Sequence, residues 1–390
     1  MNIAFVSAIM PYPLHSGGQV RVYNLLKRLS KLHSITLYAF IRNDGEKAFL
    51  QNLSFCKRVV PIYRGRAWQL SYLARSIFGS MPFLYATYQN EVLRTLLSDD
   101  MSQFDLVHIE PGYVFPSLPA DLSIPLVVSE HNIEHTVYEG YTKRRVISFA
   151  RPFFQLDVKK MKKWQMQIWD RAHCVITVSD DDKKYIETHS VQKKVAVVSN
   201  GVDTEYFRLT PKKKPDAKNL KFLYVGNFSW IQNTDAIEHI LRDIWPPLQS
   251  KFPGATFTII GRHFPEKLRG LSTDSVRIID QVEDIRNAYH DADALLAPVR
   301  IGGGTRYKVL EAMATGLPVI TSTLGASGLG VSDKKEVYIA NSPEEVQRCI
   351  NGVLSETIRK KLVLTARSLI ESKYSWETIA SLQDACWKSV

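Results

Sequence analysis

The sequence predicts an α/β protein made of two doubly wound, Rossmann-like domains that face each other across a cleft. Its 390 residues exceed one ordinary core and suit two domains of typical size. Short apolar or β-branched runs recur in two series, separated by segments long enough for helices, which is typical of buried parallel strands. Between the two series lies a segment with two prolines and four lysines that has little to bury.

The expected strands follow in order along the chain. In the first domain they are residues 2–7, 34–40, 105–110, 126–130, 174–179 and 195–199, and in the second 220–226, 256–261, 276–280, 292–299, 317–322 and 336–340. Most are apolar on both faces, as strands between two helix layers are. We therefore expect a first domain over residues 1–205, a linker over 206–219, a second domain over 220–372, and a C-terminal helix over 373–390 that packs back on the first domain.

Composition excludes several other classes. Apolar residues make up 45% and charged residues 23%, the balance of a globular protein. No apolar run approaches the ~18 residues of a membrane-spanning helix. The opening MNIAFVS is interpreted as a strand and not as a signal peptide. The four cysteines, Cys56, Cys174, Cys349 and Cys386, lack C-x-x-C spacing, so we expect neither a disulfide framework nor a zinc site, and a cytoplasmic location.

The net charge of +11 is unevenly distributed. Residues 57–90 hold five basic residues and no acid, and residues 141–171 hold nine basic residues against two acids. Such clustering favours a polyanionic surface. Nucleic acid is not the expected partner, because no recognition motif accompanies the charge.

In open α/β sheets the ligand lies beyond the carboxyl ends of the strands, so loops that follow strands are the places to look for chemistry. The first such loop holds Gly17 and Gly18 before an expected helix. Glycines there let backbone approach an anion at a helix N-terminus. The alternative is a tight turn that needs glycine for its conformation alone.

The second loop begins with His131, directly after the strand 126–130. A histidine at this edge can face a ligand, and the alternative is a structural histidine satisfied by its neighbours. The string H-x-x-E-H from His131 to His135 suggests metal, but no third ligand accompanies it, so we expect no metal site.

The third loop is the most specific. Gly302, Gly303 and Gly304 open an expected helix and can offer a nest of backbone N–H groups to an anion. Arg306 and Lys308 add full positive charges, and Glu311 further along can accept from vicinal hydroxyls. Together they indicate a sugar–phosphate ligand. The alternative is a glycine-rich turn with a solvated basic helix face.

These segments together resemble the retaining family-4 glycosyltransferases of the GT-B type, in the bacterial group that carries GGGTR and LEA. The resemblance covers nearly the whole chain, from SGGQVR and SEHN through SNGVDTEYF, LYVGNFSWIQNTDAI and DQVEDI to IGGGTRYKVLEAMATGLPVI and YSWETIA. It implies a first domain that binds the acceptor and a second that binds a nucleotide-sugar.

The resemblance also implies roles for single residues. Glu311 would hold the donor ribose, Val282 would meet the nucleobase through its backbone, and His131 would hydrogen-bond the transferred sugar. The remaining donor contacts would come from Gly18, Gly226, Asn227, Gly302, Gly303, Gly304 and Thr305. Arg306 and Lys308 would join His131 as catalytic residues, and we assign Arg21 and Glu110 to acceptor binding.

Two departures from the family pattern bear on these roles. Many members carry two acids spaced E-x7-E, whereas here Gly303 stands at the first position and Glu311 at the second. Many also place Arg and Lys after the first strand of the second domain, where this chain has Asn227 and Asn233. Our hypothesis is that Arg306 and Lys308 supply the missing cations.

The implied activity is metal-independent, retaining transfer of a hexosyl group from a nucleoside-diphosphate-sugar. No cofactor is expected, and the donor would be UDP- or GDP-linked. The acceptor would be a glycan or a lipid-linked glycan of cell-surface polysaccharide or glycolipid biosynthesis. A nucleotide-sugar epimerase and a non-catalytic sugar-nucleotide-binding module remain as alternatives.

A lipid-linked acceptor would give the two basic stretches, 57–90 and 141–171, a purpose as peripheral contacts with the anionic inner face of the cell membrane. Within 154–169 an apolar helical face is expected, with Trp164 and Trp169 at an interface. The alternative is an ordinary amphipathic helix packed on its own domain.

Overall fold

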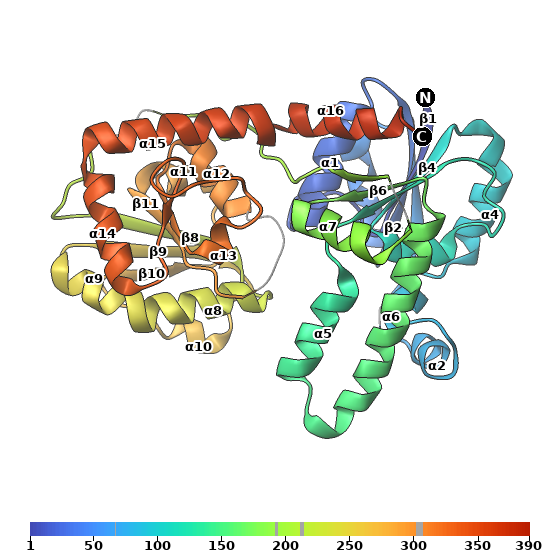
Figure 1. Cartoon of the computed structure of the whole chain (residues 1–390), viewed down its shortest axis with the longest axis horizontal. Helices are drawn as coiled ribbons and strands as arrows, with labels where there is room; N and C mark the ends of the chain where they lie inside the picture. Colours follow the sequence, from blue (N-terminus) through green and yellow to red (C-terminus); the bar gives the residue numbers. More distant parts are fainter. Residues whose placement is uncertain (67, 192–193, 211–213, 302–306) are drawn as a thin grey trace. The chain divides into compact units, whose positions relative to one another are not determined.

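The computed structural model describes residues 1–66, 68–191, 194–210, 214–301 and 307–390. These residues form two compact units, one of residues 1–200 with 379–390 and one of residues 201–378. Each unit is built on one parallel sheet with helices around it (Figure 1). The predicted fold class, two doubly wound α/β domains, is confirmed.

The first unit holds a seven-stranded sheet in the order β3-β2-β1-β4-β5-β6-β7. Its strands are β1 (Asn2–Ser7), β2 (Ser34–Ile41), β3 (Arg58–Tyr63), β4 (Leu106–Glu110), β5 (Leu126–Glu130), β6 (Cys174–Thr177) and β7 (Val195–Val197). All of them pair in parallel. The strand order reverses between β1 and β4, so the loops that follow these two strands flank the crevice where such sheets bind ligands.

Helices surround this sheet. They are α1 (Gly17–Leu29), α2 (Leu70–Phe78), α3 (Phe83–Ala86), α4 (Glu91–Asp100), α5 (Glu134–Arg145), α6 (Arg151–Arg171) and α7 (Asp180–His189), with 3-10 turns η1 (Asp44–Leu53), η2 (Met101–Gln103), η3 (Gly112–Ser117) and η4 (Ser148–Ala150). Successive side chains of β1 point to opposite faces of the sheet, and both faces are covered. Ala4 and Val6 join the core cluster that includes Met161 of α6, while Phe5 contacts Trp387 edge-on, 6.5 Å between ring centroids.

The edge strand β3 has no counterpart among the strands expected from the sequence. Its residues RVVPIY include Pro61, which cannot donate to a ladder, and most of them are only partly buried. Both features suit an edge position, where one side of the strand has no partner. The sequence therefore indicated only a basic stretch in this region and no strand.

The second unit holds a six-stranded parallel sheet in the order β10-β9-β8-β11-β12-β13. Its strands are β8 (Lys221–Asn227), β9 (Thr256–Arg262), β10 (Val276–Ile279), β11 (Ala294–Ala297), β12 (Val319–Thr321) and β13 (Tyr338–Ile339). Here the order reverses between β8 and β11, which directs attention to the loops after these strands.

Two apolar layers enclose this sheet. Its helices are α8 (Ile231–His239), α9 (Trp245–Lys251), α10 (Glu266–Arg269), α11 (Ile285–Asp291), α12 (Tyr307–Thr315), α13 (Thr323–Ala326), α14 (Pro343–Leu354) and α15 (Glu356–Leu369), with π-helical turns η5 (Ile240–Ile244) and η6 (Ile370–Tyr374). The last helix, α16 (Trp376–Trp387), begins in this unit and continues into the first. Phe222 and Tyr224 of β8 pack with α8, α9 and α14, whereas Leu223 between them packs with α11, α12 and α15.

The unit boundaries differ from the expected ones. Residues 201–207, expected in the first domain or linker, lie in the second unit because Val202 and Phe207 are buried in its core and Val202 N donates to Tyr374 O (2.7 Å). Residues 379–390, most of α16, lie in the first unit. There His33 contacts Asp384 (2.7 Å) and Cys174 Sγ lies 2.7 Å from Cys386 Sγ, both cysteines being free.

Candidate active site

The first unit builds a polar cluster at the carboxyl ends of β4 and β5. Glu110 is the last residue of β4, and His131 follows β5 directly. His131 Nε2 lies 2.7 Å from Glu110 Oε1, and Arg21 Nε of α1 donates to the same oxygen (2.8 Å). The structure therefore joins three of the predicted site residues, which are 89 and 21 residues apart along the chain.

Glu110 and Arg21 form a fully buried ion pair. Burial by itself would raise the pKa of Glu110, but the Arg21 charge and the hydrogen bonds with His108 and His131 outweigh it and hold that pKa well below its usual range. Glu110 is thus a carboxylate that accepts hydrogen bonds only. Arg21 Nη1 also donates to Val198 O (2.8 Å) and Ser199 O (2.9 Å), which ties the pair to the segment after β7.

Gly18 lies against His131. Ser16 caps α1 through its side chain, and a Cβ added at Gly18 would come within 3.6 Å of His131 Cε1 and 3.8 Å of Nδ1. The first loop and the second loop of the sequence analysis thus meet at one imidazole. Arg21 and Glu110, expected to contact an acceptor, are each only 1% exposed. They lie behind His131, where they can orient it and cannot reach a ligand.

In the second unit Glu311 is partly exposed on α12, and the Tyr289 hydroxyl donates to its Oε2 (2.6 Å). Burial raises the pKa of Glu311, and the Tyr289 hydrogen bond and the Lys308 charge oppose that rise. The predicted residues just before this helix, Gly302, Gly303, Gly304, Thr305 and Arg306, lie outside the described residues.

Lys308 connects α12 with α8 and, through Asn233, with the end of β8. Its Nζ donates to Asn233 Oδ1 (2.7 Å) and lies 3.8 Å from the centroid of the Tyr224 ring. Asn233 Nδ2 in turn donates to Asn227 O (2.7 Å). A Cβ at Gly226 would come within 2.9 Å of Asn233, so only glycine leaves room for this asparagine. A cation from α12 therefore stands at the loop where many family members carry cations of their own.

Val282 packs at the rim of the second core, on the side of α11 and α12. Near it lies a surface group that was not predicted from the sequence. The Tyr206 hydroxyl donates to Asp284 (3.2 Å), and the Arg286 guanidinium lies over the Tyr206 ring at 4.2 Å. Only the aromatic character of Tyr206 in SNGVDTEYF could have signalled it.

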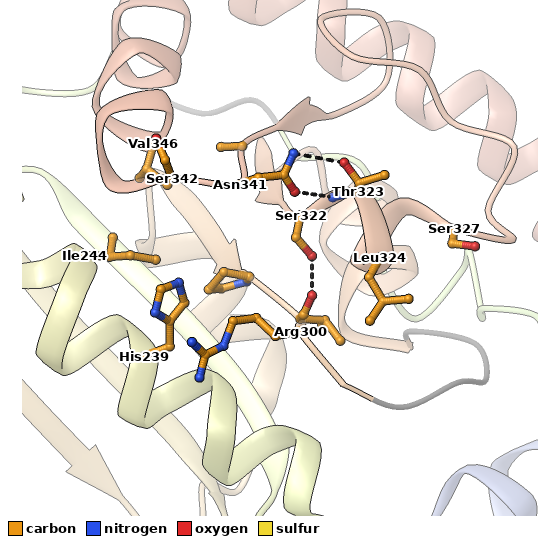
Figure 2. Close-up of a pocket in the computed structure, with 13 residues that line it drawn as sticks. His239, Ile244, Arg300, Ser322, Thr323, Leu324, Ser327, Asn341, Ser342 and Val346 are labelled. Atoms are coloured by element: carbon orange, nitrogen blue, oxygen red, sulfur yellow. Dashed lines mark hydrogen bonds between the residues drawn. The ribbon is translucent and has the colours of Figure 1, made fainter. Parts of the chain in front are cut away.

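The second unit also contains a cavity of about 440 Å³ beyond β11, β12 and β13. Figure 2 shows Arg300, Ser322, Thr323 and Asn341 around it, with Ser322 Oγ donating to Val299 O and Asn341 bonded to Thr323. His239 and Ile244 line it from α8 and η5. The Arg300 guanidinium pairs with Asp235 (2.9 Å).

Two buried glutamates stand behind the His131 loop. Glu130 Oε1 accepts from Trp169 Nε1 (2.8 Å), and a Cβ at Gly112 would come within 2.7 Å of that oxygen. Burial raises the pKa of Glu130 to about 8 and that of Glu134 to about 7. Both carboxyls are therefore protonated in the folded protein at neutral pH or just below it.

This arrangement predicts a pH-dependent stability. Because both pKa values are raised on folding, their contribution is fully present below about pH 4.5 and is lost as the pH rises toward 8. Glu130→Gln, which mimics the protonated carboxyl, should reduce the loss of unfolding free energy between pH 5.5 and 7.5 by about 1–3 kcal/mol. Denaturant unfolding followed by tryptophan fluorescence measures it, with exposed Glu187→Gln as control. Parallel pH profiles for wild type and Glu130→Gln would contradict the assignment.

The expected interface tryptophans are turned inward. Trp169 is fully buried, and Trp164 Nε1 donates to Ser80 O (3.0 Å), so both hold α6 to its own unit. The expectation that Trp169 faces an interface is wrong, because Trp169 belongs to the buried face of α6 with Met161, Gln165 and Ile168. Trp164 is half-buried against the same core.

Exposed apolar side chains lie instead on and just before α2, and at the start of α6. Lys160 Nζ donates to Ser76 O (2.6 Å) and Gly79 O (2.7 Å), which ties α2 to the middle of α6. Phe78 at the end of α2 is 89% exposed, and Phe149 just before α6 is 85% exposed. We call the exposed group the α2/α6 patch; its members are Trp68, Leu70, Ile77, Phe78, Ile147, Phe149, Phe153 and Leu156. Figure 1 shows α5 and α6 extending from the first sheet as a pair, with α2 beside α6.

Within the described residues no three His, Cys, Asp or Glu side chains gather as a metal site. His135 of the H-x-x-E-H string is engaged with Gln165 (2.8 Å) and Tyr185 (2.9 Å). In the described part of the chain every helix is too short or too polar to cross a membrane.

Two parallel-sheet domains of this kind define the class of GT-B glycosyltransferases. Residues 15–206 match the family model "Glycosyltransferase Family 4", and residues 219–356 match "Glycosyl transferases group 1". The chain belongs to the family-4 glycosyltransferases of the GT-B class, as its motifs predicted.

A sequence relative agrees with this membership, and solved structures share the fold. The chain is 25% identical over 394 residues, 96% of its length and 94% of the relative's, to a phosphatidyl-myo-inositol mannosyltransferase of Mycobacterium tuberculosis. Its fold is similar to sucrose-phosphate synthase of Thermosynechococcus elongatus (16% identity, TM-score 0.75, covering 100% and 99% of the chains). It is also similar to Anabaena Alr3699/HepE in complex with UDP-glucose (15% identity, TM-score 0.66, 100% of both chains).

Proposed function

We propose that the protein is a retaining, metal-independent glycosyltransferase that moves a hexosyl group from a nucleoside-diphosphate-sugar to a glycan or lipid-linked glycan. The observation that carries the proposal is the position of Lys308. Its ammonium group lies on the same helix as Glu311 and reaches the loop after β8 through Asn233. A carboxylate suited to ribose hydroxyls and a cation suited to a diphosphate therefore belong to one helix of the second unit.

In the proposed reaction the bond between the anomeric carbon and the phosphate oxygen breaks as the acceptor oxygen bonds to the same face. The acceptor hydroxyl gives its proton to the leaving phosphate, so the anomeric configuration is retained. Lys308, with Arg306 from the neighbouring loop, stabilises the charge that develops on the phosphate, which is usually the largest contribution in such catalysis. His131, held by Glu110, hydrogen-bonds the transferred sugar.

Support for the donor class comes from the solved relative that binds UDP-glucose. A UDP- or GDP-linked sugar fits the proposal equally well, because the expected base contact at Val282 is to backbone. Support for a lipid-linked acceptor comes from the mannosyltransferase relative, whose name specifies phosphatidyl-myo-inositol.

Acceptor-dependent release of nucleoside diphosphate tests the proposal. The purified chain is incubated with UDP- and GDP-sugars, with and without a lipid extract, in EDTA. Release that requires the extract, together with an α product from an α-linked donor, is expected. A new nucleotide-sugar without transfer would indicate the epimerase alternative, and neither product would indicate a non-catalytic binding module.

We further propose that the α2/α6 patch contacts an anionic membrane surface at the inner face of the cell membrane. Exposed aromatic side chains can enter the lipid interface, and lysines such as Lys159, Lys162 and Lys163 beside them can meet anionic headgroups. This patch differs in its residues from the face predicted for α6, but it lies in the same two basic stretches.

Removing two of its aromatic rings should weaken vesicle binding. Phe78→Ser with Phe149→Ser is expected to lower binding to vesicles that contain phosphatidylglycerol by about tenfold or more, since each ring contributes ~1.5–3 kcal/mol when fully buried. Flotation of protein with vesicles measures this. Leu364→Ser, at an exposed position of α15, is the matched control. Equal binding of the double variant and the control would refute the contact.

A further inference from the structure

Behind His131 the first unit buries a chain of polar side chains that the proposed reaction does not use directly. It runs from Trp387 near the end of α16, through His108 and Glu110 of β4, to His131 after β5. Trp387, His108 and Glu110 are 0–1% exposed, so this chain is sealed from solvent up to the imidazole of His131. We call it the Trp387 relay.

The first step of the relay fixes the proton of His108. Trp387 Nε1 lies 3.0 Å from His108 Nδ1, and an indole N–H can only donate. His108 Nδ1 must therefore be an unprotonated acceptor. Burial lowers the pKa of His108, against the opposing effect of Glu110, so the ring is neutral and carries its one proton on Nε2.

The second step directs that proton to the carboxylate. His108 Nε2 faces Glu110 Oε2 (3.3 Å) and Ser129 Oγ (3.2 Å). Glu110 is ionised and accepts only, and its other oxygen, Oε1, is shared by Arg21 and His131. The carboxylate is thereby held by donors on both oxygens, in one orientation.

The last step determines which nitrogen of His131 carries a proton. Because Glu110 Oε1 can only accept, His131 Nε2 must carry a proton. The opposite nitrogen, Nδ1, is then the one turned to the Gly18 side, as the position of a Cβ at Gly18 shows. Where the His108 contact is lost, Glu110 is held through Oε1 alone by Arg21 and His131, and its orientation toward His131 is less tightly fixed.

We propose that Trp387 is a positioning residue, which acts through His108 and Glu110 to keep His131 protonated on Nε2 with Nδ1 facing the Gly18 loop. The effect on turnover rests on the proposed function, whereas the protonation pattern does not. Trp387 of the C-terminal helix thus affects the chemistry at His131 although Trp387 itself never touches a substrate.

Trp387→Phe tests the proposal in the full-length protein, because phenylalanine keeps an aromatic ring beside Phe5 and His33 but removes the N–H donor. Long-range ¹H–¹⁵N spectra report which nitrogen of each histidine is protonated. Asp384→Asn is the matched control, since it weakens the contact of the same helix with His33 and leaves His108 untouched. Circular dichroism establishes that both variants are folded.

In wild type and Asp384→Asn we expect His108 protonated on Nε2 only, and His131 with a fixed Nε2–H. In Trp387→Phe we expect the His108 Nδ1 signal to shift because its hydrogen bond from the indole is lost, and the His131 signals to shift or broaden. A wild-type His108 protonated on Nδ1, or His131 signals unchanged between the two variants, would overturn the proposal.

Turnover should show kcat lowered about tenfold in Trp387→Phe with donor KM unchanged. If wild type transfers no sugar, the proposed function fails while the spectra still decide the relay.

Discussion

Lys308→Ala is expected to lower kcat/KM for sugar transfer by about 100-fold or more, because one preplaced charge at a developing oxyanion contributes ~10²–10³ in rate. The ammonium group is held by Asn233 at 2.7 Å and by the face of the Tyr224 ring at 3.8 Å, so it needs little reorganisation to meet a phosphate. Steady-state assays with varied donor concentration measure the loss.

The control is Lys360→Ala, which removes a lysine from an exposed ion pair with Glu356 on α15. Such a pair contributes little to stability, so this variant should behave as wild type in every assay. Lys308→Ala should melt close to wild type, since the side chain is only partly buried. Wild-type turnover in Lys308→Ala would remove Lys308 from the proposed mechanism, and Arg306 would then have to supply the charge alone.

Glu110→Gln is expected to destabilise the first unit by about 3–5 kcal/mol, because it leaves the buried Arg21 charge without its counter-ion. The amide would also turn N–H donors toward His108 or His131, which themselves donate to Glu110. Transfer activity should fall with stability. Guanidinium unfolding, monitored by tryptophan fluorescence, measures the loss.

A double variant separates the effect of Glu110 on stability from its effect on activity. In Arg21→Met with Glu110→Leu both charges are gone, and removal of a whole buried pair is far less costly than removal of one partner. We expect only part of the stability to return, because the carbonyls of Val198 and Ser199 also lose the Arg21 donor. Activity should stay low because His131 has lost its acceptor. Restored activity in the double variant would show that Glu110 matters for folding alone.

Much of the fold could be predicted because buried parallel strands are apolar on both faces. β1 and β5 begin and end at the expected residues. β3 could not be found, since an edge strand is half exposed and tolerates Pro61. The segment 201–207 was assigned to the wrong side of the boundary, because nothing local reveals that Val202 and Phe207 are buried against residues more than 100 positions later.

Motifs in the sequence indicated His131, Lys308 and Glu311 as candidate site residues, and their roles stay predictions. Their partners were not predictable. Arg21 and Glu110 were predicted to contact the acceptor, and only the fold shows that they neutralise each other out of reach of solvent. In the second unit Tyr289 contacts Glu311 from the preceding helix, and in the first unit Trp387 contacts His108 across 279 residues; no spacing in the sequence indicates either contact.

Nucleotide binding tests most directly the central claim that Lys308 and Glu311 belong to a nucleoside-diphosphate site. Thermal unfolding is recorded with UDP, GDP, ADP and CMP, each in EDTA, for wild type, Lys308→Ala and Lys360→Ala. A ligand at ~100 times its Kd stabilises the folded state by about 2.7 kcal/mol. We predict that UDP or GDP raises the melting temperature of wild type and Lys360→Ala and has no effect on Lys308→Ala. Stabilisation that survives in Lys308→Ala, or no stabilisation of wild type by any diphosphate, would contradict the claim.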